Sequence, residues 1–318
     1  MLSVIVTAYN RKEFLLEALQ SVINQTLERD KYEVICIKNF KDTKIDRYIK
    51  DNGIRSILKK KKNIGEYLLI SAKIAKGKIL VFLDDDDLFS KYKLERITSV
   101  FSKDEVGFYH NLQLKGKEFG VKFPCLKEDD FKIIKYPYKH SIKCAIQGSA
   151  NMSSIAIKRN ILISYSNELK KVIASPDSFT LIISLISKTD VFIDNNKLTF
   201  YRLHNKNISI PRSLKKYLKF YKEIVIPAYL YQLKLADKSN VKLAKLILWR
   251  LLFGVLSDLA IKSNNRKDLI KAFKYLSLNS IDKRIIKRIG LSILFLLGSN
   301  SPHKRLTRIF NNNNSKFK

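Results

Sequence analysis

Three short apolar runs near the start of the chain constrain its fold more than any other feature. They are LSVIVTA at 2–8, YEVICIK at 32–38 and KILVFL at 78–83. Each has the continuous β-branched character of a strand that is buried on both faces. Helix-periodic segments lie between them, one after the first run and another at 63–77. Strands that alternate with helices at this spacing form βαβ units, so the sequence predicts a parallel sheet with helices on its faces.

A run of four aspartates, Asp84–Asp87, follows the third apolar run directly. In parallel sheets ligands bind beyond the carboxyl ends of the strands, and this run is expected to lie there. Adjacent carboxylates repel one another, but together they suit a hard cation such as Mg²⁺ or Mn²⁺, which binds carboxylates together with substrate phosphates. The alternative is a solvated acidic turn that caps a helix beginning near Lys91, because aspartate is also a common helix cap.

Five motifs occur in a fixed order along the chain. They are SVIVTAYNRKEFLLEALQSVINQT (3–26), NIG (63–65), AKGKILVFLDDDDLF (75–89), SPD (175–177) and YRLHNKNIS (201–209). Together they resemble the family 2 glycosyltransferases of GT-A fold, over residues 2–210. The resemblance implies an inverting enzyme that moves a sugar from a nucleotide-diphosphate sugar to a hydroxyl of a glycan or lipid-linked acceptor. It also implies the fold class: an α/β, Rossmann-like, mostly parallel sheet flanked by helices, here followed by a basic helical region.

The resemblance assigns nucleotide and metal contacts to residues near the strand ends. The positions that match the donor nucleotide site are Thr7, Ala8, Tyr9, Asn10, Asn39, Asn63, Asp84 and Asp85. The D-x-D positions are Asp84 and Asp86, with Asp86 as the expected direct ligand of Mg²⁺ or Mn²⁺ and His204 as a further metal or diphosphate contact. Taken alone, Tyr9 and Asn10 would form a plain strand-to-helix connection with Asn10 as helix cap. A lone histidine such as His204 is more often structural.

The expected catalytic base is Asp177, which lies 90 positions after Asp87. Members of the family have an acidic residue here, and inverting transfer needs a base that takes the proton of the acceptor hydroxyl. The preceding residue is Pro176, where the family usually has Glu. The alternative role for Asp177 is a helix N-cap, which the sequence SPDS suits well, and one residue can serve both purposes. Arg202 is a candidate for neutralising phosphate.

One family motif is missing from this chain. After the second strand the family usually has Asp-Asp-Gly-Ser, whose acid contacts the nucleotide base. This chain reads CIKNFKD, so Lys38 and Asn39 replace both acids and Phe40 replaces the glycine. Asn39 can still hydrogen-bond a base edge, but Lys38 cannot accept a proton from uracil N3. A nucleotide other than uridine, or recognition through other groups, is therefore an open alternative.

Residues 101–210 have a mixed pattern that predicts shorter elements. VGFYHNLQL indicates a strand, a helix is expected over 178–187, and VFIDN and LTFYRLH indicate two separate short strands. The domain prediction is a catalytic domain at 1–210, a basic helical region at 211–310 and a disordered tail at 311–318.

The region from residue 211 onward is the most basic part of the chain. It holds 24 lysines and arginines against 5 aspartates and glutamates. Leucine-rich faces with a basic fringe, as around 249–252 and 285–297, can lie in the interface of an anionic membrane. The alternative is that these helices pack on the catalytic domain and present their lysines to water.

The overall composition limits the remaining classes. A formal net charge of +32 favours anionic partners, but the basic residues are dispersed without a recognisable nucleic-acid module, so no nucleic acid is expected. Three widely spaced cysteines and a strand-like N-terminus predict a cytoplasmic protein that can associate with the cytoplasmic face of the membrane. The competing functions are a nucleotidyltransferase-like enzyme and an inactive nucleotide-sugar-binding scaffold, which the missing acids of the second strand would permit.

Overall fold

The structure is a computed structural model that describes residues 1–59, 63–117, 121–138, 142–204, 213–277, 283–298 and 301–302. The chain divides into two compact units, Met1–Leu203 and His204–Lys318. The predicted domain boundary at residue 210 and the predicted disordered tail at 311–318 lie outside the described residues, so both stay predictions. All three cysteines are free thiols.

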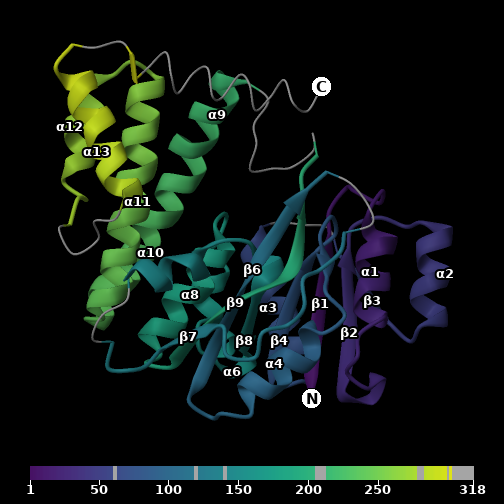
Figure 1. The fold of residues 1–318 in the computed structure, drawn as a ribbon. Helices are drawn as coiled ribbons and strands as arrows, with labels where there is room; N and C mark the ends of the chain where they lie inside the picture. The colour runs from purple at the N-terminus through teal and green to yellow at the C-terminus, as the bar shows by residue number, and fades with distance from the viewer. Residues whose placement is uncertain are drawn as a thin grey trace. The chain divides into compact units, whose positions relative to one another are not determined.

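One sheet of nine described strands forms the centre of the first unit (Figure 1). The strands are β1 (Leu2–Ala8), β2 (Tyr32–Lys38), β3 (Arg55–Leu58), β4 (Ile79–Asp84), β5 (Leu88–Phe89), β6 (Val106–Gly116), β7 (Phe131–Ile134), β8 (Ile155–Lys158) and β9 (Asp190–Arg202). Their order is β3-β2-β1-β4-β8-β6-β9-β5, and β7 pairs with β9. The β1, β2, β3 and β4 pairings are parallel, which confirms the βαβ prediction. Beyond β4 the sheet is mixed: β8 runs antiparallel to both of its neighbours, and β6 pairs with β9 in parallel.

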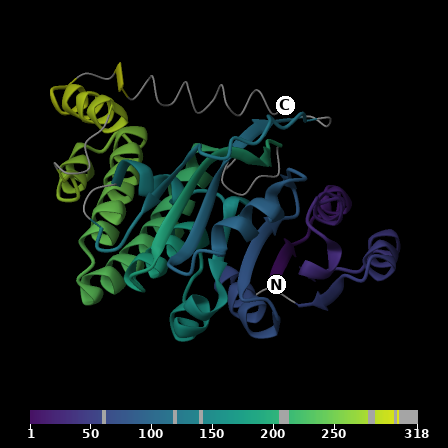
Figure 2. The ribbon, with the colours of Figure 1, turned by 60° about the horizontal axis from the view of Figure 1, so that its bottom comes forward.

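Helices cover both faces of this sheet (Figure 2). They are α1 (Leu15–Ile23), α2 (Thr43–Asp51), α3 (Ile64–Ile74), α4 (Lys93–Phe101), α5 (Ile142–Ala145), α6 (Arg159–Ser164), α7 (Ser166–Leu169) and α8 (Pro176–Ile186). Helices α1, α2 and α4 share one core cluster against the sheet. Helix α3 leads back across the sheet from β3 to β4, and a right-handed connection places it on the opposite face. There it packs against α6, which in turn packs against α8.

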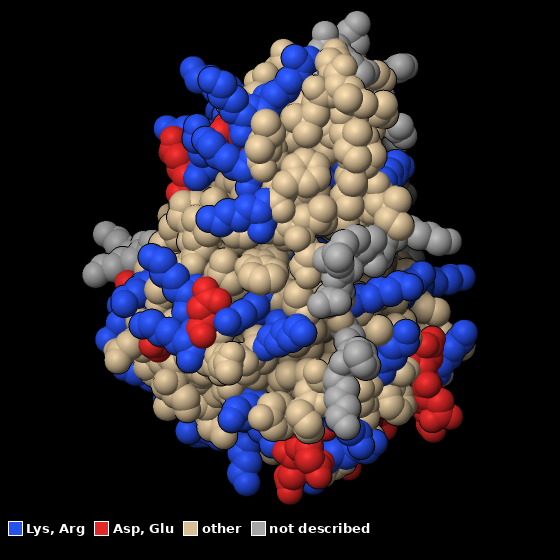
Figure 3. Space-filling view, turned by 90° about the vertical axis from the view of Figure 1, so that its left-hand side faces the viewer, with Lys and Arg blue, Asp and Glu red and all other residues tan. Residues whose placement is uncertain are grey.

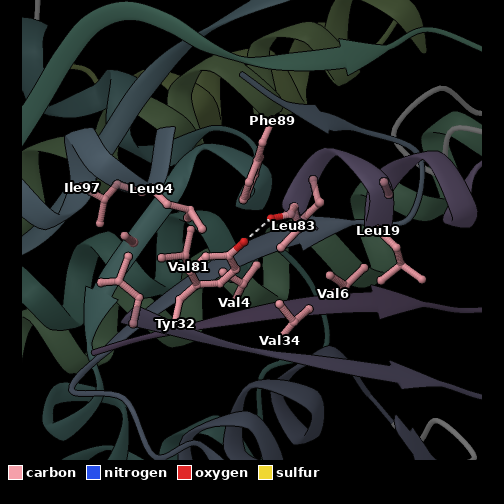
Figure 4. Close-up of a cluster of buried hydrophobic side chains, with 14 of the residues drawn as sticks. Val4, Val6, Leu19, Tyr32, Val34, Val81, Leu83, Phe89, Leu94 and Ile97 are labelled. Atoms are coloured by element: carbon pink, nitrogen blue, oxygen red, sulfur yellow. Dashed lines mark hydrogen bonds between the residues drawn. The ribbon is translucent and has the colours of Figure 1, made fainter. Parts of the chain in front are cut away.

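The core beneath α1 and α4 follows from the alternation of side chains along the strands (Figure 4). Val4 and Val6 of β1 lie beside Val81 and Leu83 of β4 in register, and these side chains point to the same face. The Tyr32 hydroxyl also lies in this core, where it donates a hydrogen bond of 2.9 Å to the Val22 carbonyl oxygen. This packing fixes the ends of β1 and β4, which carry the predicted site residues.

The prediction of two short strands near 191–203 is wrong, because β9 is one continuous strand of 13 residues. Its pairing with β6 shifts register at three places, including Asn111/Leu112 and Leu112/Gln113. Irregular register lets a long strand bend without ending. The strand therefore reaches Arg202 next to the aspartate run instead of stopping near Asn195.

The second unit is helical, as its sequence pattern predicts. Its elements are α9 (Leu214–Phe220), a π-helical turn (Tyr221–Val225), α10 (Ile226–Ser239), α11 (Lys242–Lys262), α12 (Arg266–Phe273) and α13 (Lys283–Leu296). A core cluster joins α11, α12 and α13 through residues that include Phe253, Leu269 and Phe295. None of the described helices combines the length and the apolar character that crossing a lipid bilayer demands.

Candidate functional site

The carboxyl ends of three neighbouring strands bring predicted site residues together. In the sheet register Thr7 lies beside Ile37 of β2 and Asp84 of β4, and Ala8 lies beside Lys38. The Thr7 hydroxyl donates a hydrogen bond of 3.3 Å to Asp84 Oδ1. The aspartate run thus begins at the edge of the sheet where ligands of parallel sheets bind, as predicted.

Asp84–Asp87, hereafter the aspartate turn, is closed by a backbone hydrogen bond of 3.2 Å from Asp87 N to Asp84 O. Asp84 is half-buried, whereas the exposed fractions of Asp85, Asp86 and Asp87 are only 2%, 6% and 0%. The next long helix, α4, begins at Lys93, beyond the turn. The alternative of a solvated, helix-capping acidic turn is therefore wrong.

Arg11 lies between two carboxylates of the aspartate turn. Its Nη1 is 2.6 Å from Asp86 Oδ2, and its Nη2 and Nε contact both carboxylate oxygens of Asp85. The guanidinium is a fixed planar fork, so it can hold two carboxylates at once. Sequence reasoning missed Arg11, although an arginine one residue after Asn10 in a strand-end loop is a signal that could have indicated it.

Burial and mutual repulsion raise the pKa values of three carboxyls in the aspartate turn. The pKa of Asp84 is raised to about 7 by burial and then by the charge of Asp86. Burial also raises the pKa of Asp85 to about 7, although Arg11 opposes the shift. The pKa of Asp87 lies well above its usual range, because of burial and then the charges of Asp86 and Asp84. An additional cation would stabilise the ionised form of these carboxyls.

The residues of the aspartate turn fit the predicted divalent cation. Among the described ranges, no three His, Cys, Asp or Glu side chains are arranged as a ready-made metal site. Mg²⁺, however, is usually held by one or two carboxylates, with phosphates and water as its other ligands. Asp84 and Asp86 supply two carboxylates of this hard-oxygen type.

Asp177 is the second residue of α8, and Ser175, whose φ of 51° is left-handed, lies at the cap position, so the alternative of Asp177 as helix N-cap is wrong. Its Oδ1 accepts a hydrogen bond of 2.9 Å from Ser178 N, and its Oδ2 accepts one of 3.0 Å from Asn151 N. Burial raises the pKa of Asp177 above its usual value, and its charge in turn contributes to the raised pKa of Asp84. The carboxylate thus stabilises the start of α8 and is also close enough to the aspartate turn to interact with it electrostatically.

Asn151 connects the aspartate turn with Asp177. Its backbone N–H donates to Asp177, and its side-chain amide donates a hydrogen bond of 3.2 Å to Asp87 Oδ2. Its φ of 63° and ψ of 111° are rare for a residue other than glycine. The preceding carbonyl, of Ala150, contacts His110 Nε2 at 2.7 Å. Sequence reasoning missed Asn151, whose only signal was an asparagine within the polar run SANMSS.

The loop after β1 is held by a reciprocal pair of asparagines. Asn10 N donates to Asn39 Oδ1 over 2.8 Å, and Asn39 Nδ2 donates to Asn10 Oδ1 over 2.7 Å. Asn10 has a φ of 55°, and α1 begins five residues later with Phe14 at the cap position, so the alternative of Asn10 as helix cap is wrong. Tyr9 is 41% exposed beside this pair, and Ala8 is buried. The role of these residues in donor binding stays a prediction.

The side chain of Lys38 lies in the connection between β2 and α2. Its Nζ forms an ion pair of 2.7 Å with Asp46 and donates a hydrogen bond of 2.7 Å to the Phe40 carbonyl oxygen. Only 2% of Lys38 is exposed. The lysine that replaces the family's acid therefore has a structural partner of its own within α2.

Asn63 belongs to a backbone connection that leads toward Asp177. Its Oδ1 caps α3 by accepting from Glu66 N over 2.8 Å, and its Nδ2 donates to the Lys170 carbonyl oxygen over 3.0 Å. Two residues on, Gly65 N donates to the Val172 carbonyl oxygen, and a Cβ at Gly65 would lie 1.8 Å from another carbonyl oxygen. The NIG motif thus holds the segment before Asp177, while nucleotide contact by Asn63 stays a prediction.

Arg202 is buried beneath the aspartate turn. Its Nε donates to the Asp86 carbonyl oxygen over 3.0 Å, its backbone N–H donates to Asp87 Oδ1 over 3.1 Å, and its Nη2 pairs with Glu17 over 2.6 Å. These contacts hold the aspartate turn in place. They also engage the guanidinium of Arg202, which the sequence suggested as a group for neutralising phosphate. His204 is half-buried and begins the second unit, and its predicted metal contact stays a prediction.

Comparison with known sequences finds glycosyltransferases. The model described as Glycosyl transferase family 2 matches residues 3–159. An uncharacterized glycosyltransferase of Rickettsia bellii is 26% identical over 272 residues, which cover 75% of this chain but only 36% of the relative. A poly(ribitol-phosphate) beta-glucosyltransferase of Bacillus spizizenii is 30% identical over 122 residues, or 36% of this chain and 19% of the relative. The chain therefore spans about a third of the length of the first of these relatives and a fifth of the second.

Solved structures show the same fold. S. aureus TarS 1-349 in complex with UDP-GlcNAc superimposes with a TM-score of 0.59 at 13% identity, covering 98% of this chain and 91% of that one. The mannosyltransferase PcManGT of Pyrobaculum calidifontis, in complex with GDP-Man and Mn²⁺, gives 0.52 at 13% identity, covering 99% and 85%. The fold is that of the GT-A glycosyltransferases, and residues 3–159 of this chain belong to glycosyl transferase family 2.

Proposed function

We propose that this chain is an inverting glycosyltransferase that moves a sugar from a nucleotide-diphosphate sugar to an acceptor hydroxyl. The observation that carries the proposal is the connection through Asn151, which joins the aspartate turn to Asp177. A donor-binding group and a candidate base are thereby held next to each other. In this proposal Thr7, Tyr9, Asn10 and Asn39 surround the nucleotide at the ends of β1 and β2.

Asp177 supplies the base in this proposal. The acceptor oxygen forms a bond to the anomeric carbon, the bond from that carbon to the diphosphate oxygen breaks, and the hydroxyl proton passes to the Asp177 carboxylate. A base works best when its pKa lies near the working pH, and burial moves the pKa of Asp177 upward. The two N–H groups that donate to its oxygens fix the direction of the carboxylate.

Asp86 and Asp84 are the proposed ligands of Mg²⁺ or Mn²⁺. When bound, such an ion neutralises the negative charge that develops on the departing diphosphate. The chain's own contribution is to hold the two carboxylates in place, through Thr7 at Asp84 and through Arg202 at the Asp86 carbonyl. The Mn²⁺ in the complex of PcManGT supports this choice of metal.

The donor and acceptor classes are proposed from the similar proteins, from the residues beside β1 and β2, and from the charge of the chain. TarS binds UDP-GlcNAc and PcManGT binds GDP-Man, so the fold accommodates both nucleotides. Lys38 and Asn39 replace the two acids of the family motif, and Lys38 is paired with Asp46. Asn39, which contacts Asn10 in the loop after β1, is therefore the proposed contact to the nucleotide base. We propose a glycan or lipid-linked acceptor, and the name of the B. spizizenii relative suggests that a phosphate-containing polymer belongs to this range. Such an anionic acceptor matches the net charge of +32.

A thermal-shift screen tests the donor class. UDP, GDP and their sugar conjugates are added with Mg²⁺ or Mn²⁺, and a ligand at a hundredfold its Kd is expected to stabilise the fold by about 2.7 kcal/mol. Two controls accompany the screen. Free nucleosides, which lack the diphosphate, should cause no shift, and EDTA should abolish the shift that a nucleotide causes. If no nucleotide raises the melting temperature with either metal, the proposed donor class is wrong; a shift without any sugar transfer would instead favour the inactive nucleotide-sugar-binding scaffold.

A second proposal concerns where the enzyme works: we propose that the second unit rests on an anionic membrane surface. Helix α13 buries Ile285 and Phe295 in its core, yet its other face exposes Ile286, Ile293 and Leu294 by 46–58%. Leu297, at 79% exposure, extends this stripe at helical spacing. Exposed Arg284 and Lys287 lie on the same helix. On the part of the surface formed by the second unit, Figure 3 shows an area without charged side chains that lysines and arginines border.

Reversing the character of this stripe tests the membrane proposal. The double substitution Ile293→Asp and Leu297→Asp is expected to reduce binding to vesicles with anionic lipid at least tenfold, because burial of each such side chain contributes about 1.5–3 kcal/mol. Ile163→Asp, at a 39% exposed isoleucine of α6, is the matched control. Co-sedimentation with anionic and with purely zwitterionic vesicles measures the effect. Equal binding of the double variant and the control would contradict the proposal.

A further inference from the structure

Arg11 holds carboxylates that the proposed metal needs. Its guanidinium pairs with Asp86 over 2.6 Å and contacts both oxygens of Asp85. The side chain of Arg11 is 17% exposed, against 2% for Asp85 and 8% for Asp86, so the pairs are shielded from water. A divalent cation that binds Asp86 must therefore compete with a positive charge that is already in contact with the same carboxylate.

This competition predicts how the site treats metal and nucleotide. Breaking the shielded pair with Asp86 is unfavourable, because Arg11 then keeps Asp85 as its carboxylate partner but loses the second carboxylate that its Nη1 contacts. A cation alone would have to break the contact between Arg11 and Asp86 without supplying a new anionic partner for the guanidinium. A donor that arrives with the metal brings a diphosphate, and guanidinium groups bind phosphate oxygens in the same two-pronged manner as carboxylates.

We propose that Arg11 is an exchangeable counter-ion of the aspartate turn, which releases Asp86 to the divalent cation and transfers its guanidinium to the donor's diphosphate. The proposal rests on the proposed function, since it takes the metal and the diphosphate from there. Its consequence is thermodynamic: metal and nucleotide favour each other's binding, and Arg11 opposes metal binding when no nucleotide is bound.

A fixed structural role for Arg11 would have the opposite effect. If the guanidinium only braced the aspartate turn, its removal would loosen the turn and weaken metal binding. If it is a counter-ion that must move, its removal makes Asp86 available and strengthens metal binding without nucleotide. The sign of the change separates the two roles.

The experiment measures Mn²⁺ affinity by electron paramagnetic resonance, with and without UDP or GDP. Without nucleotide, Arg11→Gln is expected to bind Mn²⁺ roughly 5- to 150-fold more tightly than the unaltered chain, the usual range of coupling between two sites. Arg11→Lys keeps the charge but loses the two-pronged contact, so its affinity should fall between the two. With the nucleotide present, Arg11→Gln should gain less Mn²⁺ affinity than the unaltered chain gains.

Lys12→Gln is the matched control, because it removes one positive charge from the neighbouring residue. Lys12 is 66% exposed and pairs with Asp42, not with the aspartate turn. It should leave Mn²⁺ affinity unchanged, and melting temperatures check that each variant is folded. If a folded Arg11→Gln variant binds Mn²⁺ as tightly as the unaltered chain, or less tightly, the proposed role of Arg11 is wrong. The proposed metal site itself would not be affected by that result. No Mn²⁺ binding by any of the proteins, even with nucleotide, would overturn the metal assignment and this proposal together.

Discussion

Asp177→Asn is expected to bind the donor nucleotide almost normally and to transfer sugar about 10²- to 10⁴-fold more slowly, the usual contribution of a general base. The amide has nearly the same shape as the carboxylate, but it cannot take a proton from the acceptor hydroxyl. One of the two N–H donors at this position, from Asn151 or Ser178, loses its acceptor in the variant. A stability loss of about 1 kcal/mol should therefore accompany the loss of transfer.

The matched control separates a role as base from a role in stabilising the first turn of α8. Asp42 caps α2 by accepting from Ile45 N, so Asp42→Asn removes a carboxylate from a comparable place at a helix start. If Asp177 only stabilised α8, the two variants would lose similar stability and both would keep their turnover. Single-turnover transfer and nucleotide titration, measured side by side, decide between the roles. Near-normal turnover of Asp177→Asn would show that another group accepts the proton.

The pH dependence of transfer gives an independent check on Asp177. Burial raises its pKa above the usual range for an aspartate, and only the ionised form accepts a proton. Transfer by the unaltered chain should therefore fall as the pH drops through this raised pKa. The residual transfer of Asp177→Asn should lack that limb of the profile.

The parts of the fold that the sequence predicted are those in which short-range pattern and packing agree. Strands β1, β2 and β4 are continuous apolar runs, and no other element type buries such runs as well in an alternating α/β chain. The pattern near 191–203 failed because polar residues within β9, such as Asn195, looked like a break. In the structure Asn195 donates to Asp130, so a tertiary contact satisfies a residue that the local pattern places in a turn.

The candidate site was predicted less completely, because its connections are tertiary. The aspartates and Asp177 stood out by type and position, whereas Arg11 and Asn151 gain their meaning only from partners far along the chain. Asn151 meets Asp87 from 64 positions away, and Arg11 meets Asp85 from 74 positions away. Single-sequence patterns carry no information about such pairings.

The four aspartates of the turn have different contacts in the structure. Asp87 is fully buried, and the Arg202 N–H and the Asn151 amide both donate to it. Asp85 is bound on both oxygens by Arg11. Asp84, which is half-buried, and Asp86, which contacts Arg11 through Oδ2, are the D-x-D positions and stay the proposed ligands of the cation.

Asp86→Ala is accordingly expected to abolish the Mn²⁺-dependent part of donor binding. The backbone carbonyl of residue 86 still accepts from Arg202, so the turn should keep its shape while one proposed ligand disappears. Nucleotide affinity in Mn²⁺ should fall to the value that the unaltered chain shows in EDTA. Calorimetric titration of UDP or GDP into each protein, in Mn²⁺ and in EDTA, measures this difference.

Two substitutions of other aspartates make the Asp86 result specific. Asp46→Asn removes a carboxylate that pairs with Lys38 outside the aspartate turn, so it should leave Mn²⁺-dependent binding intact. Asp87→Asn should mainly lower the melting temperature, because it disturbs a buried acceptor of two hydrogen bonds. Undiminished Mn²⁺-dependent binding by Asp86→Ala would remove Asp86 from the metal site. An equal loss in all three variants would mean that general loosening of the fold, and not a missing ligand, explains the effect.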